Sequence, residues 1–278
     1  MPYTAEISRA NPSCFLFLID QSGSMRDPFG ADPGRSKAHG VSDAINRLLQ
    51  NLVIKCAKTE GVRDYYHVGV IGYGYHCGPA LAGPLAGRDL VPISEVADNP
   101  ARVEKRTRKI EDGTGGLVEH TVKFPVWFDP VASGGTPMCQ ALRGAKGVLE
   151  TWISRHPDGF PPIVINITDG EATDGDPTAP AGDLTFLAGA DGNVLLFNLH
   201  LSSHKASPVE FPDREEELPD NFAKMLFRMS STLPDYMRSF AQEEGYAIAE
   251  NSRGFVFNAD MVSIIRFLDI GTRPGNLR

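Results

Sequence analysis

The stretch Phe15–Met25, "FLFLIDQSGSM", joins an apolar run to a group of oxygen-bearing side chains. The apolar run is typical of a central strand that is buried on both faces of a sheet. It ends in Asp20, and Ser22 and Ser24 follow at alternate positions. All three residue types favour turns, because their side chains bond to nearby backbone groups. They are also oxygen donors of the kind that Mg²⁺ and Ca²⁺ prefer, so this stretch alone leaves both interpretations open.

Around this stretch, strand and helix patterns alternate along the chain. Apolar segments predict strands at Cys14–Ile19, His67–Tyr73, Ile163–Thr168 and Val194–Leu201. Apolar residues at three- and four-residue spacing predict amphipathic helices over 41–56 and 138–153. Toward the C-terminus we expect helices at Tyr236–Glu244 and Asp260–Leu268, with a short strand at Gly254–Asn258 between them. The alternation predicts an α/β fold: a doubly wound open sheet, mostly parallel, with helices on both faces.

Two long segments depart from the alternation. We expect one domain over residues 1–278, with an insertion at about 78–133 and a long connection at about 202–234. Loops of this length in a compact domain are usually functional or disordered. The insertion contains a polar segment, Pro100–Asp112, that we expect to be helical. Its basic cluster Arg102–Lys109 has two open interpretations, a solvated helix face or a docking patch for an acidic partner.

Composition limits the kinds of function. The formal net charge of -8 argues against nucleic acid as a partner. No segment approaches the roughly 18 consecutive apolar residues of a membrane span, so we expect no membrane partner. The first 13 residues lack the apolar core of a signal peptide. The four cysteines are widely separated, which is typical of reduced, mostly buried thiols. These features together predict a cytoplasmic protein.

Two more segments bring oxygen donors to the ends of predicted elements. Asp169 comes directly after the strand Ile163–Thr168, and Thr136 lies in a loop with Gly134 and Gly135. Taken singly, each has a structural explanation, since Thr136 could cap the helix that follows and Asp169 could form a turn. Because the carboxyl ends of parallel strands meet at one edge of a sheet, we expect these donors to lie beside Asp20. Their joint occurrence favours a metal site.

The three motifs together resemble the von Willebrand factor A (VWA) domain, a family with a Rossmann-like doubly wound sheet and a metal-ion-dependent adhesion site (MIDAS). Asp20, Ser22 and Ser24 in D-x-S-x-S match its first motif, Thr136 in "GGTPM" its second, and Asp169 in "TDG" its third. The spellings are most similar to the bacterial intracellular members, including those associated with tellurite resistance. The resemblance implies that these five residues are the metal ligands.

The same resemblance implies a function. Mg²⁺ takes oxygen ligands in near-octahedral geometry, and neutral hydroxyls among them leave the ion electrophilic. An acidic side chain of another protein then completes the coordination. We therefore expect a metal-dependent protein–protein interaction module acting in a larger bacterial assembly, and no enzyme. The expected metal is Mg²⁺, with Mn²⁺ or Ca²⁺ as alternatives, because the same oxygens accept all three.

The surroundings of the site supply weaker expectations. Met25, Trp127, Glu171 and Asp174 are predicted to form a rim that contacts the partner. For Trp127 the alternative is packing of the insertion onto the sheet. The acidic loop that holds Glu171 and Asp174 also contains Asp176, and it is open to two interpretations, a second cation site or a solvated loop. The glycines of "GYGYHCG" (72–78) lack the spacing of a dinucleotide loop, so we expect them to relieve backbone crowding.

Two rivals to the adhesion hypothesis stay open. The first is a Mg²⁺-dependent hydrolase acting on phosphate esters, because oxygen-ligated Mg²⁺ orients phosphates and activates water. Against it, His67 and His76 are linked to the second predicted strand and not to the metal motifs, so no general base is evident. The second is a structural subunit whose metal only staples loops together.

Overall fold

The computed structural model describes residues 2–29, 32–111, 117–201 and 207–272. Across these ranges the main sheet has eight strands, in the order β15-β16-β14-β11-β1-β6-β7 with β8 also paired to β6. Five of them are parallel and form the body of the sheet: β1 (Ser13–Asp20), β6 (Tyr66–Tyr73), β11 (Ile163–Thr168), β14 (Leu195–Leu201) and β16 (Phe255–Ala259). The short strands β7 (Cys77–Pro79), β8 (Val91–Pro92) and β15 (Val209–Glu210) are antiparallel at the two sides.

The strand order reverses at β1. From β1 the chain moves to β6 on one side, then returns to β11 on the other side and continues outward to β14 and β16. This confirms the predicted doubly wound, mostly parallel sheet. In such sheets the connections that leave two neighbouring strands diverge at the reversal and open a crevice at the carboxyl ends. Here the reversal lies between β1 and β11, and the first and third motifs stand at the carboxyl ends of these two strands.

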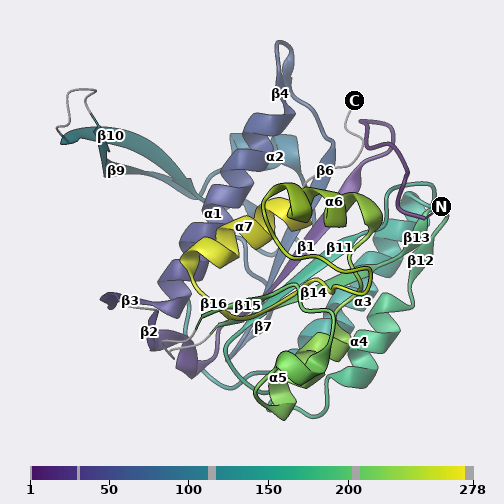
Figure 1. The fold of residues 1–278 in the computed structure, drawn as a ribbon. Coiled ribbons are helices and arrows are strands. Elements are labelled where there is room, and N and C mark those ends of the chain that lie inside the picture. Colours follow the sequence, from purple (N-terminus) through teal and green to yellow (C-terminus); the bar gives the residue numbers. More distant parts are fainter. Residues whose placement is uncertain (1, 30–31, 112–116, 202–206, 273–278) are drawn as a thin grey trace.

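Helices cover both faces of the sheet (Figure 1). On one face lie α1 (Lys37–Cys56), α2 (Ile93–Asp98), α6 (Asp235–Glu243) and α7 (Met261–Gly271). On the other face lie α3 (Met138–Arg155), α4 (Thr178–Thr185) and α5 (Asn221–Met229). The predicted helices correspond to α1, α3, α6 and α7, whereas α2, α4 and α5 were not predicted. Helices α2 and α4 have six and eight residues, too few turns for a periodic apolar pattern, and α5 lies within the segment 202–234 that was expected to be a connection.

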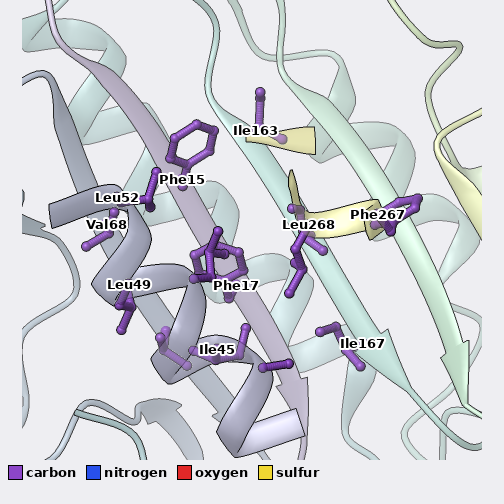
Figure 2. Close-up of a cluster of buried hydrophobic side chains, with 14 of the residues drawn as sticks. Phe15, Phe17, Ile45, Leu49, Leu52, Val68, Ile163, Ile167, Phe267 and Leu268 are labelled. Carbon is purple, nitrogen blue, oxygen red and sulfur yellow. The ribbon is translucent and has the colours of Figure 1, made fainter. Parts of the chain in front are cut away.

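The core is divided by the sheet into two layers. Successive side chains of β1 point to opposite faces, so Phe15 and Phe17 join the layer under α1 and α7. Leu16 and Leu18 join the layer under α3. Figure 2 shows the first layer, where α1 packs onto β1 through Ile45, Leu49 and Leu52. From α7, Leu268 joins the same layer, and the ring of Phe267 packs against Phe197 of β14. Because β1 is buried along its whole length, its end is held rigidly, and so is Asp20.

The polar segment of the insertion is a β-hairpin, so the predicted helix at Pro100–Asp112 is wrong. Strands β9 (Arg102–Glu111) and β10 (Leu117–Val126) pair antiparallel and project from the body of the molecule (Figure 1). One charged side chain of β9 is in contact with an aromatic ring of β10 across the ribbon. Arg106 lies over the ring of Phe124, 3.6 Å from its centroid. Such pairs stabilise strands in segments whose residue types alone favour a helix.

The basic cluster therefore lies on the hairpin and not on a helix. Arg102 forms ion pairs with Glu104 and Asp129, and Arg106 pairs with Glu104 and with Asp43 of α1. The contact with Asp43 ties the base of the hairpin to the body. The interpretation as a solvated helix face is wrong because the segment is a strand, and the docking-patch interpretation stays open.

The remaining elements are short. Two-stranded ribbons are formed by β2 (Pro28–Phe29) with β3 (Asp32–Ser36), β4 (Ala57–Lys58) with β5 (Gly61–Val62), and β12 (Ala188–Gly189) with β13 (Gly192–Asn193). Single 3₁₀ turns occupy Gly23–Arg26 (η1), Gly83–Leu85 (η2) and Glu215–Glu217 (η3). All four cysteines are free thiols, as predicted. In the described ranges, no helix is both long and apolar enough to cross a membrane.

Candidate functional site

Asp20 is the innermost residue of the candidate site. It is the last residue of β1 and is fully buried. One carboxylate oxygen accepts a hydrogen bond from the Ser22 backbone N–H at 2.8 Å, and the other accepts one from the Thr168 hydroxyl at 2.8 Å. Burial raises the pKa of Asp20; the hydrogen bonds from Ser22 and Thr168 oppose this, and the charge of Asp169 adds to it. The carboxylate is thus fixed in position without a cationic side chain bonded to it among the described residues.

Asp169 and the two serines form a chain of hydrogen bonds. The Ser24 hydroxyl donates to Asp169 Oδ1 at 2.7 Å, and the hydroxyls of Ser22 and Ser24 lie 3.0 Å apart. The side chain of Asp169 is fully buried although its backbone is partly exposed. Ser22 is buried and Ser24 is exposed, so the chain runs from the interior to the surface. The first and third predicted motifs therefore lie side by side at the carboxyl edge.

A lysine that the sequence did not point to contacts the same carboxylate. Lys37, the first residue of α1, places its ammonium 2.8 Å from Asp169 Oδ2. Its side chain is only 5% exposed, which is rare for lysine unless it is paired. A second carboxylate, that of Asp27, lies 3.9 Å away and is mostly exposed. Lys37 is therefore the counter-ion of Asp169 inside the site.

The second motif is joined to the first through the backbone. Gly23 N–H donates to the Gly134 carbonyl at 3.0 Å, and Ser133 N–H donates to the Gln21 carbonyl at 2.6 Å. These bonds place the loop that leads to Thr136 directly against the turn that carries the two serines. Thr136 itself is buried, at 5% exposure. Structure and expectation agree that all three motifs meet at one place.

Thr136 is held by its backbone and leaves its hydroxyl available. Its N–H donates to the Thr173 hydroxyl at 2.9 Å, and its carbonyl accepts from Thr173 N–H at 2.9 Å. Its side chain does not cap α3, and in the part of the chain that the structure describes its hydroxyl makes no hydrogen bond. The N-cap alternative for Thr136 is therefore wrong, and the hydroxyl is available for an external ligand.

Two glycines permit this close packing of loops. A Cβ on Gly74, at the end of β6, would lie 2.6 Å from the Gln21 carbonyl oxygen and 2.7 Å from that of Ser133. Gly134 has a φ of +84°, and a Cβ there would lie 2.5 Å from the Tyr75 nitrogen. The expected backbone crowding in "GYGYHCG" is confirmed at Gly74. Side chains at these positions would push the Thr136 loop away from the serines.

The donor set fits a hard divalent cation. Of the two buried carboxylates, Asp169 is paired with the buried ammonium of Lys37, whereas Asp20 has no cationic partner among the described residues, so the ionised site carries a net negative charge away from water. Burying a charge without a partner is costly, and a bound cation removes that cost. Within the described residues, no three or more His, Cys, Asp or Glu side chains gather as a metal site. The candidate site has only two carboxylates, and its other donors are hydroxyls.

The predicted rim residues divide into buried and exposed pairs. Met25 is fully buried and Trp127 is 2% exposed, so neither side chain lies on the surface and their assignment to a partner-binding rim is wrong. Trp127 instead donates its indole N–H to the Val96 carbonyl at 2.7 Å, which confirms the packing alternative. Apolar residues of this size bury themselves when a core is within reach.

Glu171 and Asp174 are both exposed, but both carboxylate oxygens of Asp174 already accept hydrogen bonds, so of the two Glu171 is the better candidate for direct contact with a partner. Asp174 accepts backbone hydrogen bonds from Cys139 and Gln140, at 3.1 and 2.8 Å, and so binds the first turn of α3. Asp176 accepts from Thr178 N–H at 2.9 Å at the start of α4, and this bond lowers the pKa of Asp176. Both carboxylates accept hydrogen bonds from backbone N–H groups at the beginning of a helix, which explains their presence without a second cation site.

Sequence reasoning missed three residues of the site. Lys37 lies 17 positions after Asp20, and nothing in its neighbourhood signals that α1 would aim it inward. Thr168 precedes Asp169 in "ITDG" and could have been recognised as the next donor along the strand. Tyr75 is 74% exposed, and its N–H donates to the Ser133 carbonyl at 2.8 Å, which places an exposed ring beside the Thr136 loop.

Comparison with known proteins gives limited likeness. No family model matches the chain, and no curated protein does. A solved structure of three N-terminal domains of the type V pili tip protein Mfa5 from Porphyromonas gingivalis matches with 14% identity and a TM-score of 0.33. The vWF domain of the same protein matches with 16% identity and a TM-score of 0.29. Each match covers 58% of this chain, but only 20% and 39% of the other chain. The fold assignment therefore rests on the strand order and helix layers described above.

Proposed function

We propose that this chain is a VWA-type module that binds Mg²⁺ and, through it, an acidic side chain of a partner protein. One observation carries the proposal: two buried carboxylates lie at the carboxyl edge of the sheet, and the one buried ammonium pairs with Asp169 and leaves Asp20 without a cationic partner among the described residues. Such a site has an excess of buried negative charge, which a bound cation would neutralise. Membership of the MIDAS-bearing VWA proteins, and of their intracellular tellurite-resistance-associated group, is part of the proposal.

Each predicted ligand would have a distinct part. Asp20 and Asp169 would supply the charge that holds the ion, with Asp20 oriented from behind by Thr168. The hydroxyls of Ser22, Ser24 and Thr136 would supply neutral oxygens. When bound, Mg²⁺ would act as a Lewis acid with a position open to an external carboxylate. Mn²⁺ and Ca²⁺ are the alternatives for the same donors.

The partner surface would surround the exposed end of the site. Tyr75 is an exposed aromatic side chain next to the Thr136 loop, and aromatic anchors are enriched in protein interfaces. Glu171 is exposed in the loop that follows Asp169. We place both on the partner-binding rim, Tyr75 as an anchor and Glu171 as a charge that repels wrongly placed acidic groups. A bacterial, cytoplasmic assembly as the setting stays a prediction.

A capture experiment tests the proposal. Tagged wild-type protein is incubated with cell extract in Mg²⁺ or in EDTA, beside the Asp20→Asn variant as matched control. A genuine partner is retained only by wild type in Mg²⁺. It is then purified, and its exposed Asp and Glu residues are replaced one at a time by Asn and Gln. Loss of binding on one such replacement is the expected result, whereas binding that persists in EDTA contradicts the proposal.

The same variants separate the two rival functions. A loop-stapling metal predicts that Asp20→Asn melts far below wild type in Mg²⁺, while adhesion predicts lost partner binding with the fold retained. A phosphate-ester hydrolase predicts Mg²⁺-dependent release of p-nitrophenol from its phosphate ester, abolished by Asp20→Asn. We expect no such release above the background of the variant.

A further inference from the structure

The buried ion pair between Lys37 and Asp169 bears on how the proposed cation enters the site. Asp169 offers two oxygens, and both are engaged: Oδ1 accepts from Ser24, and Oδ2 accepts from the Lys37 ammonium at 2.8 Å. A cation that takes Asp169 as a ligand meets a positive charge already bound there. Two cations cannot share one carboxylate at this distance in a buried site without strong repulsion.

The ammonium has a second place to go. Asp27 Oδ2 lies 3.9 Å from Lys37 Nζ, and the Asp27 side chain is 58% exposed. The two residues are also joined through the backbone, because Lys37 N–H donates to the Asp27 carbonyl at 3.0 Å. This backbone bond keeps Asp27 beside Lys37 whichever rotamer the lysine side chain adopts. Rotation about the flexible side chain of Lys37 is enough to exchange one carboxylate for the other.

We propose that Lys37 is a built-in competitor of the divalent cation, paired with Asp169 in the metal-free site and with Asp27 once the metal binds. The inference rests on the proposed metal-binding function and adds a regulatory element to it. In the metal-free protein the ammonium stabilises the buried charge of Asp169 and keeps the loops assembled. The same ammonium weakens metal binding, because the incoming ion has to displace it.

The proposal predicts opposite effects of two substitutions. Lys37→Met keeps much of the side-chain volume but removes the competing charge, so we expect Mg²⁺ to bind about tenfold more tightly, or more. Asp27→Asn removes the second partner of the displaced ammonium, so we expect binding to weaken several-fold. Lys55→Met is the matched control, because Lys55 lies at the far end of the same helix in a half-exposed pair with Asp269. We expect it to leave the affinity unchanged.

The measurement is a calorimetric titration of EDTA-stripped protein with MgCl₂, together with thermal melting in EDTA. Lys37→Met is expected to melt at a lower temperature without metal and to gain more from added Mg²⁺ than wild type. If the Lys37–Asp169 pair had only a structural role, Lys37→Met would melt at a lower temperature in EDTA but would bind Mg²⁺ no more tightly than wild type. Should Lys37→Met fail to fold in EDTA, Lys37→Gln retains a polar group near Asp169 and is titrated in its place.

The outcomes separate the inference from the function on which it rests. If wild type binds Mg²⁺ and Lys37→Met binds it no more tightly, the competitor role of Lys37 is wrong and the metal site is retained. Binding by the lysine variant with none by wild type supports Lys37 as a competitor but contradicts the proposed Mg²⁺-dependent function of the wild-type chain. No binding by either protein overturns the metal site and the competitor together.

Discussion

The Thr168 hydroxyl donates to Asp20 Oδ2 at 2.8 Å and so joins the ends of two neighbouring strands, β11 and β1. Both residues are fully buried. The same hydroxyl oxygen lies 3.0 Å from the Gly170 carbonyl, to which it can donate instead. Thr168 therefore has two possible acceptors and can adapt to a change at Asp20.

This arrangement predicts that Asp20→Asn is stabilising in the absence of metal. An asparagine can accept from Ser22 N–H and donate its amide to Thr168, whose hydroxyl then turns to Gly170. It also removes a buried charge, so we expect the melting temperature in EDTA to rise by about 2 °C or more. Differential scanning calorimetry of the two proteins measures the change.

The pH dependence of this gain follows from the raised pKa of Asp20. An acid whose pKa is higher in the folded state destabilises the fold as pH rises above its unfolded value of about 3.9. The advantage of Asp20→Asn over wild type is thus largest near neutral pH and disappears toward pH values of about 4 and below. An advantage that grows on acidification would show that the cause lies elsewhere.

Trp127 and Tyr75 are predicted to respond to truncation in opposite ways. Trp127→Ala leaves a cavity and an unpaired Val96 carbonyl, which we expect to cost about 3–5 kcal/mol of unfolding free energy. Tyr75→Ala removes an exposed ring and is expected to change the unfolding free energy by no more than about 0.5 kcal/mol. Urea unfolding curves measure both. Similar costs for the two variants would contradict the assignment of Trp127 to packing and Tyr75 to the rim.

Asp174 is predicted to act on stability through α3. Asp174→Ala removes the acceptor for the N–H groups of Cys139 and Gln140, at a cost of about 1–2 kcal/mol. Glu171→Ala, three residues earlier in the same exposed loop, is the control and is expected to change the unfolding free energy little. If Asp174→Ala proves neutral in chemical denaturation, the helix-start role is wrong.

A histidine pair at the amino end of β6 predicts acid sensitivity. Trp152 Nε1–H donates to His67 Nδ1 at 2.9 Å, which requires a neutral imidazole on that nitrogen. Burial lowers the pKa of His67, and the charge of His156 lowers it further; burial likewise lowers the pKa of His156. For a histidine with a lowered folded pKa, stability is complete above the unfolded value of about 6.5 and is lost as pH falls below it.

We therefore expect the unfolding free energy to fall as pH drops below about 6.5, and His67→Gln to flatten that fall. Glutamine can still accept from the Trp152 indole, so the fold should be retained. His76→Gln, at an exposed position, is the control. An identical pH profile for wild type and His67→Gln would exclude His67 as the group that titrates.

The sheet was predictable because its strands are buried on both faces. The runs "CFLFLI" and "IVINIT" leave no alternative to a central strand, and the stripes of α1 and α3 have enough turns to be recognised. The hairpin β9–β10 was not predictable, because its stability comes from pairs such as Arg106 with Phe124, which only the folded register brings together. The charged composition of the strand favours a helix when it is read alone.

The site was predictable in its donors but not in its counter-ion. Asp20, Ser22 and Asp169 lie next to recognisable strand ends, so topology alone gathers them. Lys37 reaches the site only because α1 begins where it does, after a turn that the sequence does not specify. Met25 and Trp127 were misplaced because apolar residues near a site are equally consistent with packing and with recognition.

The most direct test of the metal site is a calorimetric titration of EDTA-stripped wild type and Asp20→Asn with MgCl₂. Asp20→Asn is the right comparison because it is expected to fold at least as well as wild type without metal. We predict saturable Mg²⁺ binding at one site per chain in wild type and none in the variant. Equal binding by both proteins, or no binding by wild type, would contradict the account.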